Sequence, residues 1–375
     1  MTKVPARVAV LFGGPSPEHD VSILTGLQAA RALSAGVSPG CQALYWAKSG
    51  AFYAVEPAAE ASAFVEGPPR GASPVELALG PEGGFRIRRR GLRPRHEPLG
   101  LDALLVCCHG GPGEDGALQS ALDLAGIAYS GPSAAGAAIG MDKLAQGALI
   151  AGAGLPALPR WLLHEGLKAL PTPGPYIIKP RYGGSSIGIE VVADLATARE
   201  RLRASVHLRR GAVLEPYRGD CWDLQIALRS FPQLELSAIE RPIRASQGAE
   251  ILDYRDKYVG GEGMSAAPRE LPAVLPPAIE AEIRAIAQEA AAVLSVRGVA
   301  RVDFLFDGEH VYLNEINTIP GSLARHLFVS PAVSFDQLLS DLLREAVERP
   351  AAQFSVAGAD GSVLREAGSI AAKLA

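Results

Sequence analysis

The N-terminal part of the chain alternates short apolar runs with amphipathic stretches. Residues 8–12 are apolar and end at two glycines, and a helical pattern follows over about 22–33. A second unit of this kind combines the apolar run 103–108 with a helix over about 118–125. Such alternation is typical of a parallel sheet covered on both faces. The segment between them, about 48–98, is rich in glycine and proline, which predicts irregular chain with room for one hairpin.

The remainder of the chain mixes shorter helices and strands. The longest helical pattern, about 276–296, has one apolar face formed by Ile279, Ile283, Ile286 and Val293. Further helices are expected over 141–152, 193–203 and 335–347, the last capped by Ser334, and strands over 176–179, 187–192, 213–217, 301–306 and 311–317. The predicted organisation is an N-terminal α/β domain, two smaller α+β domains and a loosely held tail, at 1–135, 136–218, 219–349 and 350–375.

Composition narrows the class of protein. With 375 residues, 48% of them hydrophobic and 20% charged, the chain is not disordered. The net charge of −4 gives no global basic field, so nucleic acid is not the expected partner. The six arginines within 86–95 are interpreted as a solvated hairpin, a nucleic-acid patch being the alternative.

Apolar runs and cysteines bear on location. No apolar run is long enough for a membrane span or a signal peptide, so we expect a protein that is neither inserted nor exported. The four cysteines show no metal-ligand spacing, which favours the reducing cytoplasm.

Two glycine-rich segments are candidates for phosphate binding. The pattern GxGxxG at 111–116 stands between a strand and a helix, but Glu114 and Asp115 would repel a pyrophosphate there, so we interpret it as a turn with acidic residues at the helix N-terminus. The loop 183–186 is a better candidate, because its small residues let backbone N–H groups approach phosphate oxygens and Lys179 precedes it. An ordinary hairpin loop is the alternative.

The hairpin 301–317 carries the strongest chemical signal. Residues two apart in a strand share a face, so a turn centred on Glu309 would place four polar side chains together: Arg301, Asp303, Glu315 and Asn317. Two carboxylates and an amide oxygen suit Mg²⁺ with phosphate ligands, and the arginine could stabilise a transferring phosphoryl group. A slip of one residue would split the set. The alternative is a solvated polar face, which fits poorly because the opposite face would be apolar through Val302, Phe304, Phe306 and Leu313.

Glu18 and His109 follow the first and second apolar runs. Ligands of open α/β sheets bind at the carboxyl ends of strands, so both side chains are placed where a substrate could bind. Glu18 could bind an ammonium group, although for this residue alone an acid at a helix start is the slightly preferred explanation. For His109 the alternative is a hydrogen-bonded loop histidine.

Several longer motifs follow one another along residues 8–322. They are VAVLFGGPSPEHDVS (8–22), CHGGPGEDGALQSALDLAGIAYSGP (108–132), MDKL (141–144), IIKPRYGGSSIGI (177–189), LEPY (214–217), DYRDKY (253–258), ARVDF (300–304) and LNEINTIPGS (313–322). In order and spacing they resemble the D-alanine–D-alanine ligase family of the ATP-grasp superfamily. The resemblance implies an N-terminal parallel-sheet domain followed by an ATP-grasp fold of two α+β subdomains, with ATP held between them.

The resemblance also implies roles for individual residues. ATP would be bound by Lys143, Lys179, Ser185, Ser186, Glu215, Tyr217, Lys257 and Asn314, with Glu215 and Tyr217 on the adenine side. Two Mg²⁺ ions, for which Mn²⁺ could substitute, would be held by Asp303, Glu315 and Asn317. The amino acids would contact Glu18, His109, Arg301 and His326. The catalytic set would be Glu18, Ser185, Tyr258, Arg301 and Gly321.

Within these sets, Glu18 would bind the ammonium of the first amino acid, and Arg301 and the backbone of Gly321 would meet the oxyanion. Tyr258 would link to Ser185 and Glu18 from a mobile loop that closes over the site. Two positions depart from the family pattern. His326 stands where a serine usually holds the acceptor carboxylate, and Cys221 where a ribose-binding glutamate is usual, with Asp220 or Asp223 as substitutes.

The activity implied is ATP-dependent amide formation between two amino acids through an acyl phosphate, with release of ADP and phosphate, for peptidoglycan precursor synthesis. A related ligase with another acceptor and a non-catalytic ATP-binding module are the alternatives. A cytoplasmic homodimer without nucleic-acid or membrane partners is expected.

Overall fold

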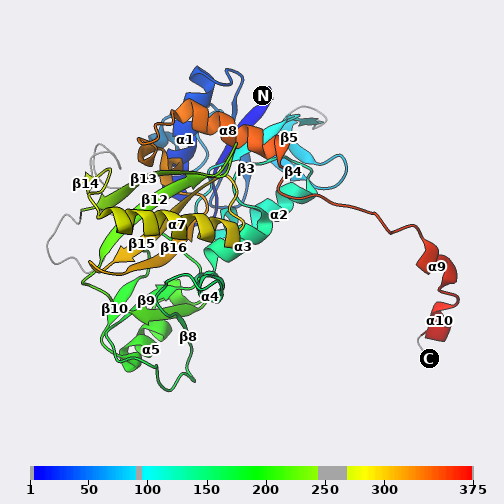
Figure 1. Cartoon of the computed structure of the whole chain (residues 1–375). Coiled ribbons are helices and arrows are strands. Elements are labelled where there is room, and N and C mark those ends of the chain that lie inside the picture. Colours follow the sequence, from blue (N-terminus) through cyan, green and yellow to red (C-terminus); the bar gives the residue numbers. More distant parts are fainter. Residues whose placement is uncertain (1–3, 90–94, 244–267, 374–375) are drawn as a thin grey trace.

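The computed structural model describes residues 4–89, 95–243 and 268–373, which form three sheets with helices packed against them (Figure 1). The first sheet has seven strands in the order β6-β5-β4-β3-β2-β1-β7. The strand β1 pairs in parallel with β2 and β7, as predicted, and the other pairs are antiparallel. The strands are β1 (Val8–Gly13), β2 (Gln42–Trp46), β3 (Phe52–Val55), β4 (Ser73–Ala78), β5 (Gly84–Arg89), β6 (Arg95–Pro98) and β7 (Ala103–Val106).

The region 48–98 is more regular than the sequence predicted. Instead of irregular chain with one hairpin, β3 to β6 form a continuous antiparallel ladder. All four residues of β3 are half-buried and all four of β6 are exposed, so these strands lack the apolar alternation that reveals a strand in the sequence. The described part of the arginine-rich stretch 86–95 belongs to β5 and to this exposed edge strand.

Helices cover the first sheet, and one of them comes from the far end of the sequence. They are α1 (His19–Ala35), η1 (Ala61–Phe64), η2 (Gly111–Gly113), α2 (Ala117–Leu124) and α8 (Phe335–Glu348). The next helix, α3 (Ala134–Met141), packs against α2. The side chain of Ser334 caps α8, as predicted. α8 packs against α1 and β7, and its leucines join the core of the first sheet. The chain therefore returns to its first sheet after building the other two.

The second sheet has the order β10-β9-β11-β8 and packs against α5. Its elements are β8 (Trp161–Leu163), β9 (Tyr176–Pro180), β10 (Glu190–Val192), α5 (Leu195–Ala204), η3 (Val206–Leu208) and β11 (Ala212–Pro216). β10 starts three residues later than predicted, because Ile187 and Ile189 donate backbone hydrogen bonds back into the preceding loop. That loop holds Ser185 and Ser186 at positive φ, 53° and 60°.

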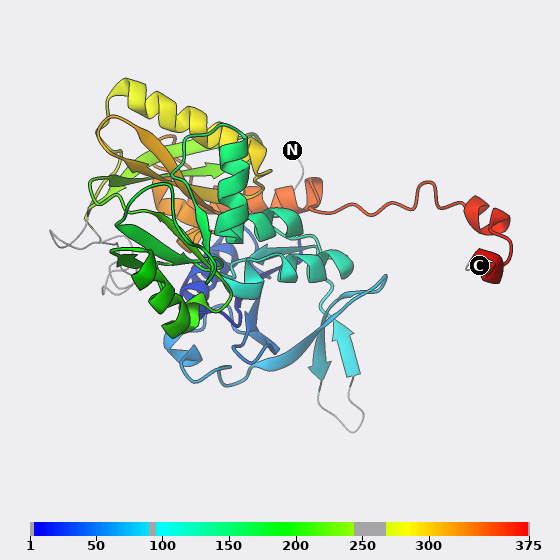
Figure 2. The same ribbon diagram turned by 90° about the horizontal axis from the view of Figure 1, so that it is seen from below.

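The third sheet has the order β14-β13-β12-β15-β16, and α4 and α7 pack on its core (Figures 1 and 2). Its elements are α4 (Lys143–Gly152), β12 (Trp222–Arg229), β13 (Glu235–Pro242), β14 (Arg269–Glu270), α7 (Pro277–Val293), β15 (Val299–Phe306), β16 (Val311–Asn317) and η5 (Gly321–Leu327). The strands β12 and β13 were not predicted from the sequence. α4 starts two residues later than predicted, because Asp142 ends α3 and caps α4.

The C-terminal segment from residue 353 runs away from the rest of the chain and carries α9 (Ser362–Glu366) and α10 (Ile370–Lys373) (Figures 1 and 2). Within the described ranges, no helix combines the length and the apolar character that crossing a membrane requires. The predicted closing loop, with Lys257 and Tyr258, lies outside the described residues.

Candidate active site

The β15–β16 hairpin has the register that the sequence predicted, with the pairs Arg301–Asn317 and Asp303–Glu315. The register shifts at the next pair, which leaves Asn314 as an extra residue in β16. Such a β-bulge changes the direction of the following side chains and is common beside active sites. Here it puts Leu313 in the core of the third sheet, while Glu315, two residues on, lines a cleft.

Two neighbouring clefts contain most of the described candidate residues. The first, between the second and third sheets, is lined by the predicted ATP-binding residues Lys143, Lys179, Ser185, Ser186, Glu215, Tyr217 and Asn314, together with Asp303. The second reaches the first sheet and is lined by Glu18, His109, Arg301, Asn317 and Gly321. Lys143, Gly184, Ser185 and Glu315 line both. The two groups of candidates therefore meet at a common wall.

A buried carboxylate organises the first cleft. Glu215 on β11 lies between two cations: Lys179 Nζ is 2.7 Å and Arg160 Nε 2.8 Å from its oxygens. Burial alone would raise the pKa of Glu215, but the charges of Lys179 and Arg160 outweigh it and hold the pKa below its ordinary value. Lys179 Nζ also donates to Asn314 Oδ1 at 3.2 Å. The bulge residue is thereby connected to the second sheet.

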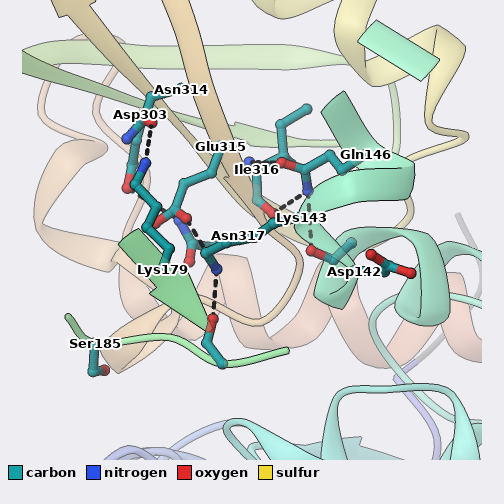
Figure 3. Close-up of polar contacts among 12 residues, drawn as sticks. Asp142, Lys143, Gln146, Lys179, Ser185, Asp303, Asn314, Glu315, Ile316 and Asn317 are labelled. Atoms are coloured by element: carbon teal, nitrogen blue, oxygen red, sulfur yellow. Dashed lines mark hydrogen bonds and ion pairs between the residues drawn. The ribbon is translucent and has the colours of Figure 1, made fainter. Parts of the chain in front are cut away.

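Lys143 is the first residue of α4 and points toward the common wall. Its Nζ donates to Gly183 O at 2.6 Å and lies 3.4 Å from Glu315 Oε2. Figure 3 shows α4 beside β16, where Gln146 exchanges two hydrogen bonds of 3.1 Å with the backbone of Ile316. The helix thus fixes both Lys143 and the strand that carries Glu315.

The polar face of the hairpin fits a hard cation in part. Arg301 forms a two-pronged ion pair with Asp303 (2.6 and 2.7 Å), and Asn317 Nδ2 donates to the same carboxylate at 3.1 Å. The atoms that Asp303, Glu315 and Asn317 could offer to a metal ion are all oxygens, which Mg²⁺ prefers as ligands. Nowhere in the described residues do three or more His, Cys, Asp or Glu side chains cluster as metal ligands. Two carboxylates and an amide would therefore hold the ion only together with phosphate oxygens and water.

Glu18 and the glycine-rich loop meet across the second cleft. Ser185 Oγ donates a hydrogen bond to Glu18 Oε1, the part of the predicted Glu18–Ser185–Tyr258 linkage that lies within the described residues. The left-handed backbone of Ser185 is rare outside glycine and is typical of functional loops. A Cβ added at Gly184 would stand 3.0 Å from the Glu18 carboxylate, so this glycine leaves room for the contact.

His109 is buried, and both of its ring nitrogens contact protein groups. Nδ1 lies 2.8 Å from Ile319 O and Nε2 2.8 Å from Thr25 Oγ1, which itself accepts from Ser322 N. A carbonyl only accepts, so Nδ1 carries the proton and Thr25 donates to Nε2. Burial lowers the pKa of His109 to about 4, and this chain of donors and acceptors fits the neutral ring. The arrangement makes His109 a support for the 319–322 segment.

Glu114 is a site residue that the sequence analysis missed. Interpreted there as a helix-terminal acid, it lies instead in the wall of the second cleft, where it accepts hydrogen bonds from Gly110 N (2.9 Å) and Ile319 N (3.0 Å). Burial and the nearby charge of Glu18 raise its pKa to about 8. The signal available was its place directly after the strand end that carries His109. The neighbouring Asp115 does accept from a helix N–H, that of Ala117.

The two departures from the family pattern lie in different surroundings. His326 is on η5 with Nε2 3.3 Å from Glu240 Oε2, and it is not among the residues that line the two clefts. The same Glu240 lies within the electrostatic reach of Arg301, which lines the second cleft. Cys221 is buried, and Asp223 lines the first cleft, whereas Asp220 is ion-paired to Arg218 at 2.7 Å. Of the two aspartates named as substitutes, only Asp223 lines the first cleft.

Comparison with known proteins adds independent findings. Residues 7–132 match the family model described as "D-ala D-ala ligase N-terminus" and residues 171–344 the one described as "D-ala D-ala ligase C-terminus". The D-alanine–D-alanine ligase of Bradyrhizobium sp. (strain ORS 278) is 30% identical over 94% of this chain and 98% of its own length. That of Parasynechococcus marenigrum (strain WH8102) is 33% identical over 92% and 99%.

Solved structures show the same architecture. The D-alanine–D-alanine ligase of Coxiella burnetii superposes with a TM-score of 0.73 at 22% identity, covering 92% of this chain and 94% of its own. The VanG D-Ala:D-Ser ligase of Enterococcus faecalis gives 0.70 at 23% identity, covering 92% and 100%. The fold and the cleft between its second and third sheets thus define an ATP-dependent ligase with the ATP-grasp fold. The chain belongs to the D-alanine–D-alanine ligase family.

Proposed function

We propose that this ligase joins two molecules of D-alanine at the expense of ATP, as its named relatives do, to supply a peptidoglycan precursor. The observation that carries the proposal is the common wall of the two clefts, formed by Lys143, Ser185 and Glu315 among others. A nucleotide in the first cleft would present its terminal phosphate at this wall. An amino acid in the second cleft would present its carboxylate there.

The chemistry follows from the weakness of a carboxylate as an electrophile. One carboxylate oxygen attacks the γ-phosphorus of ATP, the bond to the bridging oxygen breaks, and ADP leaves. The amine of the second amino acid then attacks the acyl carbon of the resulting acyl phosphate and loses a proton. The C–O bond breaks, and phosphate departs with the oxygen that came from the carboxylate. Exclusion of water protects the acyl phosphate.

The residues divide this work by charge. Lys143 and Lys179, with the 183–186 loop, offset the phosphate charge, while Glu18 binds the first ammonium group. Arg301 and the backbone of Gly321 stabilise the oxyanion of the tetrahedral intermediate. Asp303, Glu315 and Asn317 would hold Mg²⁺, which when bound neutralises phosphate oxygens. Arg301 Nε lies 2.6 Å from Asp303 Oδ1 as an ion pair.

The alternative to this proposal concerns the second amino acid, which accepts the acyl group. His326 is paired with the buried Glu240, whose pKa is held below its ordinary value although burial opposes ionisation, because His326 and Arg269 are close. A chain with histidine here could prefer an acceptor other than D-alanine. His326→Ser separates the two: a gain in D-alanine acceptor use supports the specialised acceptor, and a loss supports D-alanine.

The test of the proposed function is ADP release over pairs of D- and L-amino acids, with mass detection of the products. We expect D-alanine alone to give ADP, phosphate and the dipeptide. ADP release with no D-alanine-containing product would contradict the proposal. A homodimer in the cytoplasm is part of the same proposal. The family resemblance supports the homodimer, which light scattering checks. The four buried cysteines with free thiols support the reducing cytoplasm.

A further inference from the structure

Arg160 lies in the loop between α4 and β8, at a position to which the sequence analysis gave no role. Its side chain is only 5% exposed, which is rare for an arginine unless its charge is paired. The guanidinium contacts three elements. Nε lies 2.8 Å from Glu215 Oε1 on β11 as an ion pair, Nη1 donates to Lys143 O on α4 (3.0 Å), and Nη2 donates to Asn314 O on β16.

Each of these contacts ends at a candidate ATP residue. Lys143, Asn314 and Glu215 are all such candidates, and Glu215 also holds a fourth, Lys179, at 2.7 Å. Asn314 is the bulge residue, so it is left out of the β15–β16 pairing. Arg160 donates a hydrogen bond to its backbone carbonyl. The loop itself is fixed to the hairpin next to this point, because Leu313 N donates to Pro156 O at 2.7 Å.

Arg160 also sets the charge of this buried group. Glu215 alone would neutralise Lys179, and a neutral pair attracts phosphate weakly. With Arg160 as a second cation, the three side chains carry one net positive charge. Lys179 can therefore attract a phosphate oxygen while Glu215 remains ionised and paired.

A glycine in α4 supports this reading independently. Gly147 lies inside the helix, where glycine is unfavourable. A Cβ added at Gly147 would lie 2.7 Å from Arg160 Cδ, so the glycine leaves room for the arginine stem. Gly152, at the end of the same helix, has no atom within 4 Å of such a Cβ.

We propose that Arg160 is the positioning residue of the ATP site: it fixes Lys143, Lys179 and Asn314 relative to one another and leaves Lys179 with charge for phosphate. This inference rests on the proposed assignment of those residues to ATP. It requires no contact between Arg160 and the nucleotide. The residue should therefore govern ATP binding and leave amino-acid binding unchanged.

The test compares steady-state constants of purified variants. Arg160→Met should raise KM for ATP on the order of tenfold or more and leave KM for the first amino acid within about twofold. Arg160→Lys keeps the positive charge but lacks the planar guanidinium. Its KM for ATP should therefore lie between those of the unmodified enzyme and Arg160→Met. Arg344→Gln, at a largely buried arginine of α8 whose side chain is 11% exposed and paired to Asp341 and Glu348, is the control for loss of an ion-paired guanidinium.

Gly147→Ala keeps the charge of Arg160 and displaces its side chain. It should raise KM for ATP several-fold although alanine favours the helix, and Gly152→Ala should not change it. If Arg160→Met and Gly147→Ala change KM for ATP by less than about twofold while Lys179→Met raises it, Arg160 does not position the site and the ATP assignment stands. If Lys179→Met also has no effect, both the assignment and the inference are wrong.

Discussion

At the scale of single residues, burial and hydrogen bonding fix which groups are charged. His109 shows this most directly. Its pKa of about 4 lies below the ordinary value of 6.5, because burial disfavours the charged ring. In the chain from Ser322 N through Thr25 to His109 and Ile319 O, every donor meets an acceptor only when the ring is neutral.

The free energy of unfolding should depend on pH because of His109. A pKa lower in the folded than in the unfolded chain means that the stabilisation is complete above about pH 6.5 and is lost as the pH falls toward 4. We expect His109→Gln to remove a component of about 3 kcal/mol from the change in unfolding free energy between those values. Denaturant titrations of both proteins at several pH values measure it. Parallel curves would show that His109 is not buried as the neutral ring.

The carboxylates of the hairpin should control the metal requirement. Glu315→Gln removes one of two acidic oxygen donors, so the Mg²⁺ concentration for half-maximal ADP release should rise on the order of tenfold. Glu309→Gln is the matched control, because Glu309 is an exposed carboxylate in the turn of the same hairpin. An equal shift in both variants would contradict a specific role for Glu315.

The placement of Asp303 and Glu315 opposite each other in the hairpin, both lining the first cleft, was predictable because motif and strand periodicity agreed. Glu114 and Arg160 were missed for a physical reason. Their importance lies in partners more than 50 residues away, such as Ile319 for Glu114 and Asn314 for Arg160. No local pattern encodes such partners.

At the scale of elements, the bulge in β16 decides how the hairpin works. Strict alternation would put Leu313 and Glu315 on one face, yet one is in the core and the other in the cleft. The sequence therefore predicted the pairs Arg301–Asn317 and Asp303–Glu315 correctly. It did not predict the bulge at Asn314, which allows Leu313 to lie in the core while Glu315 lies in the cleft. The strands β3 to β6, β12 and β13 were not predicted for a different reason. Either their alternation of apolar and polar residues is weak, or no turn motif marks where they begin and end.

Deleting Asn314 tests the bulge. Leu313 and Glu315 would become neighbours in a regular ladder, with their partners Phe304 and Asp303 unchanged. We expect cooperative unfolding to persist and KM for ATP to rise on the order of tenfold, because Arg160 and Lys179 both lose an acceptor. Asn314→Ala keeps the backbone acceptor, so its effect should be smaller. An unchanged KM in the deletion would exclude the bulge from ATP binding.

At the scale of the whole molecule, the site is assembled by parts distant in sequence. The second cleft combines Glu18 and His109, which follow β1 and β7 of the first sheet, with Arg301 on β15 and Gly321 on η5. α8 returns to cover the first sheet. The segment after Ala352 takes no part in this. Phe354 and Val356 are 75% and 85% exposed.

Removal of residues 353–375 should therefore leave the enzyme intact. We expect Tm to change by less than about 2 °C and kcat to be unchanged. Calorimetry and ADP release on the shortened chain check this, and a large loss of either would show that the segment contacts the folded part.

The central claim is that a carboxylate in one cleft is phosphorylated by ATP in the other before the amide forms. The most direct measurement uses D-alanine labelled with ¹⁸O in its carboxylate, followed by mass analysis of the phosphate released. We expect one ¹⁸O atom in each phosphate released with ADP and dipeptide. Phosphate without label, or release of AMP and pyrophosphate, would contradict it.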